Sequence, residues 1–172
     1  MIDLDNVKLT YYPAKILTIK AKDVTVFDDN LRAFVDKMYD LMLEHQGVGL
    51  AAAQANKSLR LFLVSLDGTR ENSAVFINPK LELSGPWETN EEGCLSFPKM
   101  YTKIKRYRDC KVTAQDIEGR HFAGEAEGGL YSRCLQHEYD HIEGITLANR
   151  MGQAARIVHR RLLKKLEEQY CL

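Results

Sequence analysis

Long apolar runs are missing from this sequence: no segment approaches the roughly 18 consecutive apolar residues that can cross a membrane. The first six residues are partly acidic, and they lack both the apolar core of a secretory signal and the arginines of a transit peptide. We therefore expect a cytoplasmic protein that makes no contact with membranes.

Excess charge and abundant cysteine are missing as well. Basic and acidic residues number 24 each, so the formal net charge is zero and bulk electrostatics do not favour DNA as a partner. Four cysteines at irregular spacing indicate free thiols and metal ligands, not a disulfide framework. The length and an apolar content of 45% suit one domain over residues 1–172, which we expect to act as a monomer.

The sequence does contain two histidines four residues apart, His137 and His141, with Glu138 beside the first. Residues four apart share one face of a helix, so both imidazoles can bind one divalent ion while Glu138 reaches its water. A glycine pair at 128–129 and Gly144 flank the motif, as the start and stop signals of a helix do. This pattern is typical of a metallohydrolase.

A hydrolytic metal site usually has three protein ligands and one position for water, so a third donor is needed. Carboxylates and the four thiols are candidates, the latter being Cys94, Cys110, Cys134 and Cys171. Cys134 precedes His137 by three residues, but a thiol inside a helix is more often packed, here on a buried side with Leu130 and Leu135. Cys94 is favoured, because glycine before it and proline after it indicate a rigid bend.

Three motifs carry a resemblance to a known family. Residues 92–96 (EGCLS) and 136–141 (QHEYDH) closely resemble two signature motifs of the peptide deformylases, and residues 47–54 (GVGLAAAQ) resemble the third, G-x-G-L-A-A-x-Q. The order is that of the family, and the resemblance spans about residues 8–150. Ala53 stands where proline is frequent and Ile142 where leucine is usual, yet neither departure removes a chemically required atom.

The resemblance implies an enzyme that removes the N-formyl group from the formylmethionine of newly made polypeptides and releases formate. It implies Cys94, His137 and His141 as metal ligands, Glu138 as general acid and base, and Fe²⁺ as the physiological ion. Mixed thiolate and imidazole donors also suit Zn²⁺, Ni²⁺ or Co²⁺.

The same resemblance assigns oxyanion stabilisation to the Gln54 side chain and the Leu95 amide. Val48 and Gly49 would bind the substrate backbone as an added strand. We expect a Glu92–Arg106 pair to steady the bend, and Asp140 either to orient a ligand or to face water. A methionine pocket should include Leu135. The histidines expected to be ordinary surface residues are His45, His121 and His159.

Periodicity predicts an α+β fold of small, mostly antiparallel sheets around the central metal-binding helix, as in the family. An N-terminal helix should follow a cap at 28–30, and a C-terminal amphipathic helix should span about 152–169. Strands are expected at 59–66, 74–78, 81–83, 111–115 and 121–126, with a turn at 84–86.

The C-terminal helix carries a basic face. In bacterial deformylases of similar layout this helix is thought to approach the ribosome, so the resemblance implies transient ribosome contact. Two alternatives stay open: another H-E-x-x-H metallohydrolase or peptidase, which usually draws its third ligand from downstream, and a structural metal-binding protein, for which Cys134 would be the fourth ligand.

Overall fold

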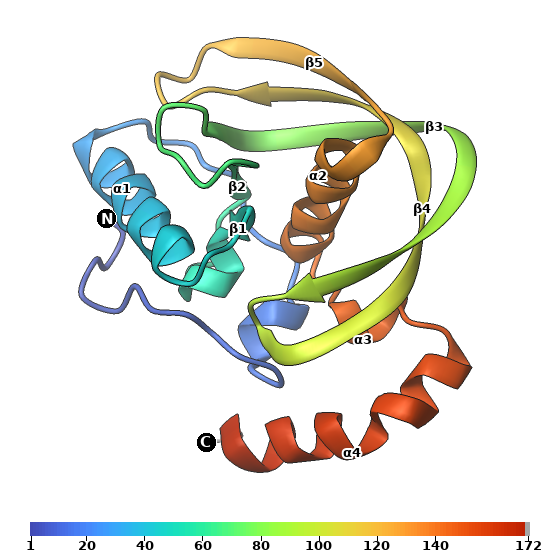
Figure 1. Cartoon of the computed structure of the whole chain (residues 1–172). Helices are drawn as coiled ribbons and strands as arrows, with labels where there is room; N and C mark the ends of the chain where they lie inside the picture. Colours follow the sequence, from blue (N-terminus) through green and yellow to red (C-terminus); the bar gives the residue numbers. More distant parts are fainter. Residues whose placement is uncertain (171–172) are drawn as a thin grey trace.

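The computed structural model describes residues 1–170 and confirms the α+β class (Figure 1). Within these residues the strands form one antiparallel sheet in the order β1-β2-β3-β4-β5, and not the several small sheets expected. The strands are β1 Gly49–Ala51, β2 Leu61–Val64, β3 Ala74–Cys94, β4 Phe97–Gln115 and β5 His121–Glu127. The helices are α1 Asp29–Glu44, α2 Gly129–Ile142, α3 Leu147–Arg150 and α4 Gln153–Tyr170, with 3-10 turns η1 Lys15–Thr18 and η2 Ala52–Ala55.

Helix α1 begins where the sequence predicted. The Asp28 side chain accepts a hydrogen bond from the Leu31 amide at 2.9 Å, which satisfies one of the free N–H groups of the first turn. The apolar stripe of α1 is buried against β1 and β2, with Phe34, Met38 and Met42 fully enclosed. This packing fixes the end of α1, from which the chain enters the glycine-rich loop at 47–54.

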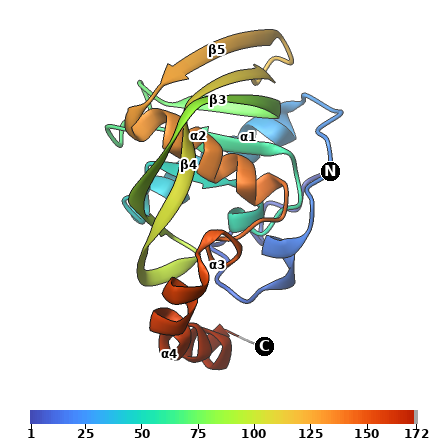
Figure 2. The same ribbon diagram turned by 90° about the vertical axis from the view of Figure 1, so that its right-hand side faces the viewer.

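Strands β3 and β4 form a long hairpin that curves around α2 (Figures 1 and 2). The turn predicted at 84–86 is wrong: pairing resumes after a register shift between Ser84 and Trp87, and the chain continues as one strand. Gly85 accommodates this bulge with a φ of +76°, a conformation that glycine adopts at little cost. The hairpin therefore reaches far enough to place Cys94 at its tip, beneath α2.

Helix α2 lies at the centre of the molecule, with the sheet wrapped around it. Gly128 at its N-cap, Gly129 as its first residue and Gly144 just beyond its end all have positive φ, in keeping with the predicted start and stop signals. The buried side contains Cys134 and Leu135 as expected, but Leu130 is 58% exposed. Leu130 lies in the first turn of α2 and lines a cavity instead of the core.

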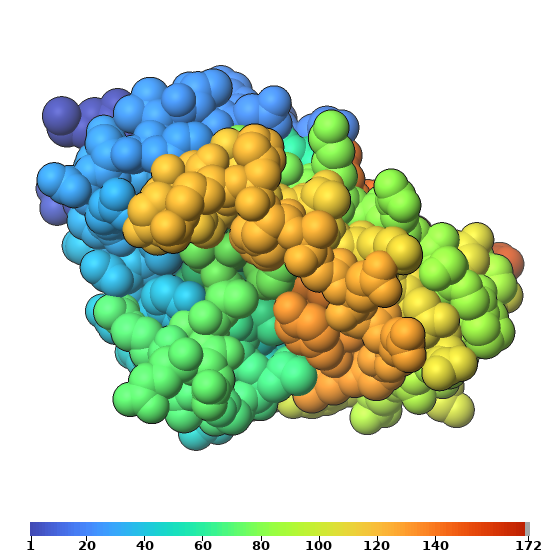
Figure 3. Space-filling model, turned by 90° about the horizontal axis from the view of Figure 1, so that it is seen from above, coloured from blue at the N-terminus to red at the C-terminus, as the bar shows by residue number. Residues whose placement is uncertain are grey.

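Helix α4 packs against the tip of the hairpin at the end of the molecule opposite β5, so the view from above almost hides it (Figure 3). Leu166 is buried in a cluster with Phe97, Met100 and Ile104. Ile157, an apolar residue of the same helix, is 70% exposed. No helix among residues 1–170 has the length and apolarity needed to span a membrane.

Candidate metal centre and active site

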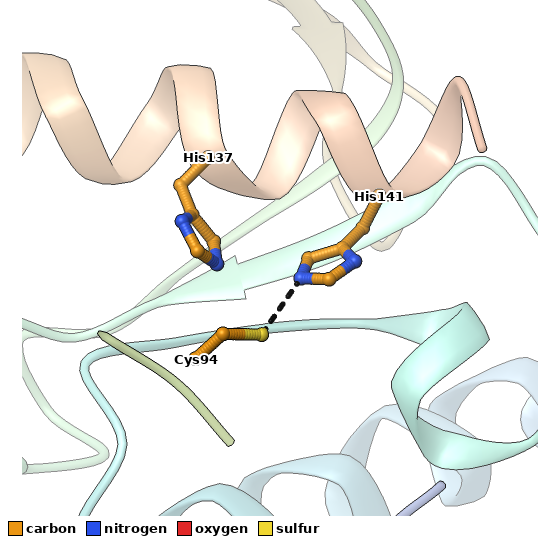
Figure 4. Close-up of side chains that lie close together, drawn as sticks. All are labelled: Cys94, His137 and His141. Atoms are coloured by element: carbon orange, nitrogen blue, oxygen red, sulfur yellow. Dashed lines mark hydrogen bonds between the residues drawn. The ribbon is translucent and has the colours of Figure 1, made fainter. Parts of the chain in front are cut away.

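Three predicted ligands come together between the hairpin tip and α2. Their donor atoms, the Cys94 sulfur and one ring nitrogen each from His137 and His141, all lie within 4.8 Å of one another. Both imidazoles point from one face of α2 toward the thiol, and Cys94 Sγ lies 3.3 Å from His141 Nε2 (Figure 4). One thiolate and two imidazoles fit a divalent metal ion and leave a coordination position for water, as in hydrolytic sites.

The other cysteines do not complete a closed site in the described residues. The Cys134 thiol donates weakly to the Val48 carbonyl at 3.6 Å, and Cys110 packs in the core beside Ser132. Neither belongs to the ligand cluster formed within residues 1–170. Cys171, another candidate from the sequence, lies outside the described residues. The absence of a fourth donor among residues 1–170 disfavours a structural metal site.

The two ligand histidines have different surroundings. His137 Nδ1 lies 3.1 Å from Glu92 Oε2, so a hydrogen bond to the carboxylate orients the ring and leaves Nε2 for the metal. His141 is buried, and burial lowers its pKa well below the ordinary value, with the charges of His137 and Arg106 adding to the effect. A neutral imidazole keeps the lone pair that a metal requires.

Glu92 and Asp140 form a buried ionic network behind the ligands. Arg106 donates twice to Glu92, at 2.7 and 2.9 Å, so the predicted pair is present, and it also donates to Asp140 at 2.8 Å. Burial alone would raise the pKa of Glu92, but hydrogen bonds from His137 and Arg106 lower it to about 2. Asp140 also accepts from Arg150 and is buried, so it does not face water.

Glu138 lies in a tight space beside the ligands. Only 4% of it is exposed, and its Oε2 has no hydrogen-bond partner within residues 1–170. Burial raises the pKa of Glu138 to about 7, although the charges of His137 and Arg106 oppose the shift. A Cβ at Gly49 would lie 2.5 Å from Glu138 Oε1, so glycine is needed there to admit the carboxylate. A side chain with this pKa can both accept and release a proton near neutral pH.

Gln54 is held with its amide nitrogen toward the ligands. Its Oε1 accepts from the Ala51 amide at 2.9 Å, while Nε2 donates to Ser96 Oγ at 3.3 Å and to Cys94 Sγ at 3.5 Å. The side chain spans from η2 to the hairpin tip, where Leu95 follows Cys94. This geometry presents a neutral N–H donor beside the predicted metal position.

A cavity of about 450 Å³ brings the predicted residues onto one surface. The predicted catalytic and substrate-binding residues that line it are Val48, Gly49, Gln54, Leu95 and Glu138, together with the ligands Cys94 and His137. Leu135, expected in the methionine pocket, is fully buried in the core and is not part of the lining. His45, expected to be an ordinary surface residue, does line the cavity.

Arg133, Tyr101 and Leu130 also line the cavity, although no sequence motif indicates this position for them. Tyr101 covers Gly93 across the hairpin, where a Cβ would lie 2.7 Å from the ring. A contact of this kind depends on strand register, which no local motif revealed.

Comparison with known proteins decides the family. The model of the polypeptide deformylases matches residues 7–156. The chain belongs to this family. A peptide deformylase of Chromobacterium violaceum is 39% identical, covering 94% of this chain and 96% of that protein. Peptide deformylase 1B of Arabidopsis thaliana, chloroplastic/mitochondrial, is 36% identical over 95% of this chain and 60% of its own length.

Solved structures agree with the deformylase assignment. A crystal structure of peptide deformylase from Plasmodium falciparum superposes with a TM-score of 0.91 at 36% identity, covering 95% of this chain and 96% of that chain. One from Legionella pneumophila gives 0.88 at 36% identity, with the same two coverages, 95% and 96%. The resemblance seen in the three motifs is thus confirmed, and the protein is an enzyme of the hydrolase class.

Proposed function

We propose that the protein removes the N-formyl group from the N-terminal formylmethionine of nascent polypeptides, acting as a cytoplasmic monomer and releasing formate and a free α-amine. The observation that carries this proposal is the position of Glu138, which lines one cavity with Cys94 and His137 of the ligand cluster and whose Oε2 has no hydrogen-bond partner within residues 1–170. Membership of the deformylase family supports the same chemistry.

Cys94, His137 and His141 would hold the metal ion, and we propose Fe²⁺ in the cell, with Zn²⁺, Ni²⁺ or Co²⁺ able to replace it. A divalent ion there would polarise the formyl carbonyl and lower the pKa of a water molecule. Glu138 would take a proton from the attacking water and deliver it to the leaving amine. Gln54 Nε2 and the Leu95 amide would donate to the former formyl oxygen as it gains negative charge.

The substrate backbone would bind at β1. This strand pairs with β2 on one side, and within residues 1–170 no strand pairs with its other side. Val48 and Gly49 line the cavity at this free edge, so an extended peptide could add as a further strand. Leu130 and Tyr101, exposed at the cavity, offer apolar contacts to its side chains.

Metal removal tests the proposed function directly. Because the ion would polarise the formyl carbonyl and activate the water, treatment with a chelator should abolish formate release from formyl-Met-Ala-Ser, and Fe²⁺ added under anaerobic conditions should restore it. Acetyl-Met-Ala-Ser is the matched control and should remain intact. Fully loaded enzyme that releases no formate, or that instead cleaves an internally quenched peptide with blocked ends, would contradict the proposal.

We also propose that α4 makes a transient contact with the ribosome, supported by an exposed basic face of Arg156, Arg160, Arg161, Lys164 and Lys165. Deleting α4 would uncover the apolar cluster around Leu166, so charge reversal is the sharper test. Arg160→Glu with Arg161→Glu should reduce co-pelleting with ribosomes, and the salt dependence should lose about one unit of slope per phosphate contact removed.

Two controls accompany this measurement. Reversing Lys103 and Lys105, exposed on β4, changes the net charge equally and should leave pelleting intact. Formate release from the tripeptide should be the same in both double variants. Equal co-pelleting of the α4 variant and the unmodified protein with ribosomes would contradict the proposed ribosome contact.

A further inference from the structure

Arg133 is a buried arginine in α2, and the deformylase chemistry described above gives it no role. It lies four residues before His137, so both side chains leave the same face of the helix. Both contact Glu92: Arg133 Nη2 donates to Oε1 at 2.7 Å, and His137 Nδ1 lies 3.1 Å from Oε2. Glu92 thus connects a guanidinium one turn earlier in α2 to the metal ligand.

Arg133 completes the set of hydrogen bonds made by the Glu92 carboxylate. Arg106 occupies one position on each carboxylate oxygen, and His137 takes the second on Oε2. Arg133 takes the second on Oε1. A carboxylate that takes part in four hydrogen bonds with three side chains is held in one orientation, because rotation would break at least one of these charge-assisted bonds.

Arg133 also joins α2 to both strands of the hairpin that carries Cys94. Its Nη2 donates to the Ile104 carbonyl of β4 at 2.7 Å, with longer contacts from Nη1 to the Glu88 carbonyl of β3 at 3.4 Å and from Nη2 to the Asn90 carbonyl of β3 at 3.5 Å. The three metal ligands come from these two elements alone. One side chain therefore restrains the helix and the hairpin relative to each other.

Fold stability alone does not account for an arginine here. Arg133 is only 8% exposed, and its buried Nε has no hydrogen-bond partner within residues 1–170. An apolar residue of similar length would fill the space without burying a charge or leaving a donor unpaired. The arginine is therefore retained at some cost to stability.

We propose that Arg133 is a positioning residue for the metal centre. It holds Glu92 against His137 Nδ1 and holds the hairpin tip against α2, so that His137 Nε2 and the Cys94 sulfur converge on one ion. This inference rests on the proposed metal-dependent function. It concerns metal retention and turnover, not recognition of the substrate side chain.

Arg133→Met tests the proposal with Arg60→Met as the matched control. Arg60 is also 8% exposed, donates to Glu143 at 2.6 Å and to a backbone carbonyl, and does not line the cavity. Cobalt affinity, measured by chelator competition and by the thiolate-to-cobalt absorption band, should fall about tenfold in Arg133→Met and remain unchanged in Arg60→Met. Turnover of formyl-Met-Ala-Ser should show a lower kcat at nearly constant KM.

Arg133→Lys is the second variant, and it still tests the proposal if Arg133→Met does not fold. Lysine can reach Glu92 as a point charge but cannot also bond the hairpin carbonyls, so its cobalt affinity should lie between those of wild type and Arg133→Met. Unchanged cobalt affinity in both variants, or a rise in KM alone, would overturn the proposal. Wild-type protein that binds cobalt but releases no formate would contradict the proposed function instead. The comparison of cobalt affinities between wild type and variants would still test the role of Arg133.

Discussion

Glu138→Gln is expected to lower the rate of formate release by about 10²–10⁴-fold while the metal content stays at the wild-type level. Glutamine keeps the shape of the side chain but cannot accept the proton of the attacking water or return it to the amine. Glu138 is not part of the ligand cluster, so metal binding does not depend on it. Formate release and metal content, measured on the same preparation, give both quantities.

Glu143→Gln is the matched control for this variant. Glu143 follows α2 and is paired with Arg60 and Lys20 outside the cavity, so its loss should leave turnover near the wild-type rate. A parallel loss of metal in Glu138→Gln would show that Glu138 supports the ligands. Turnover near the wild-type rate would show that a different group moves the proton.

Gln54→Ala is expected to raise the activation barrier by about 2.7–4 kcal/mol, a loss of about 10²–10³-fold in kcat, because one donor to the developing oxyanion disappears. The cavity would keep its metal ligands and Glu138, so metal content should not change. The measurement is steady-state formate release from formyl-Met-Ala-Ser, with metal analysis of both proteins.

Ser96→Ala tests whether turnover needs the Gln54 amide itself or only the hydrogen bond between that amide and Ser96. It removes the hydroxyl that accepts from Gln54 Nε2 but leaves the bond from the Ala51 amide to Oε1, so the amide stays in place. We expect a much smaller loss of kcat than in Gln54→Ala. A Gln54→Ala enzyme as fast as the Ser96→Ala enzyme would exclude Gln54 from the oxyanion site.

Helices α1, α2 and α4 were predictable because local signals define them. Asp28 caps α1 and the glycines around 128 and 144 bound α2, as the sequence indicated. Apolar periodicity indicated α4, although of its apolar residues Leu166 is buried and Ile157 is exposed. Helix α3, with only four residues, is too short to show any periodicity.

The long hairpin could not be predicted from local pattern. Its inward positions on β4 include Thr102 and Arg106, so the alternation of apolar and polar residues that identifies a strand is interrupted. Gly85 and Pro86 are ordinary turn residues, yet here they occupy a bulge within a continuous strand. Tertiary wrapping around α2 determines this geometry.

The cluster of Cys94, His137 and His141 and its neighbour Glu138 could be predicted because each of these residues lies in a short motif. Arg133 could not, since its partner Glu92 lies 41 residues away in the chain and the contact exists only after the hairpin folds over α2. Gly49 was recognised as important for a different reason: the sequence suggested close approach of a peptide, whereas the structure adds the space required by Glu138.

The free edge of β1 has a consequence for the range of proteins that the enzyme could process. Hydrogen bonds along a strand edge engage amide groups that every polypeptide carries, whatever its side chains. Beyond the first residue, selection by such an edge would depend on an extended, accessible backbone more than on composition. A single enzyme could then serve a whole proteome of unrelated N-terminal sequences, provided that it meets each chain before folding hides the terminus.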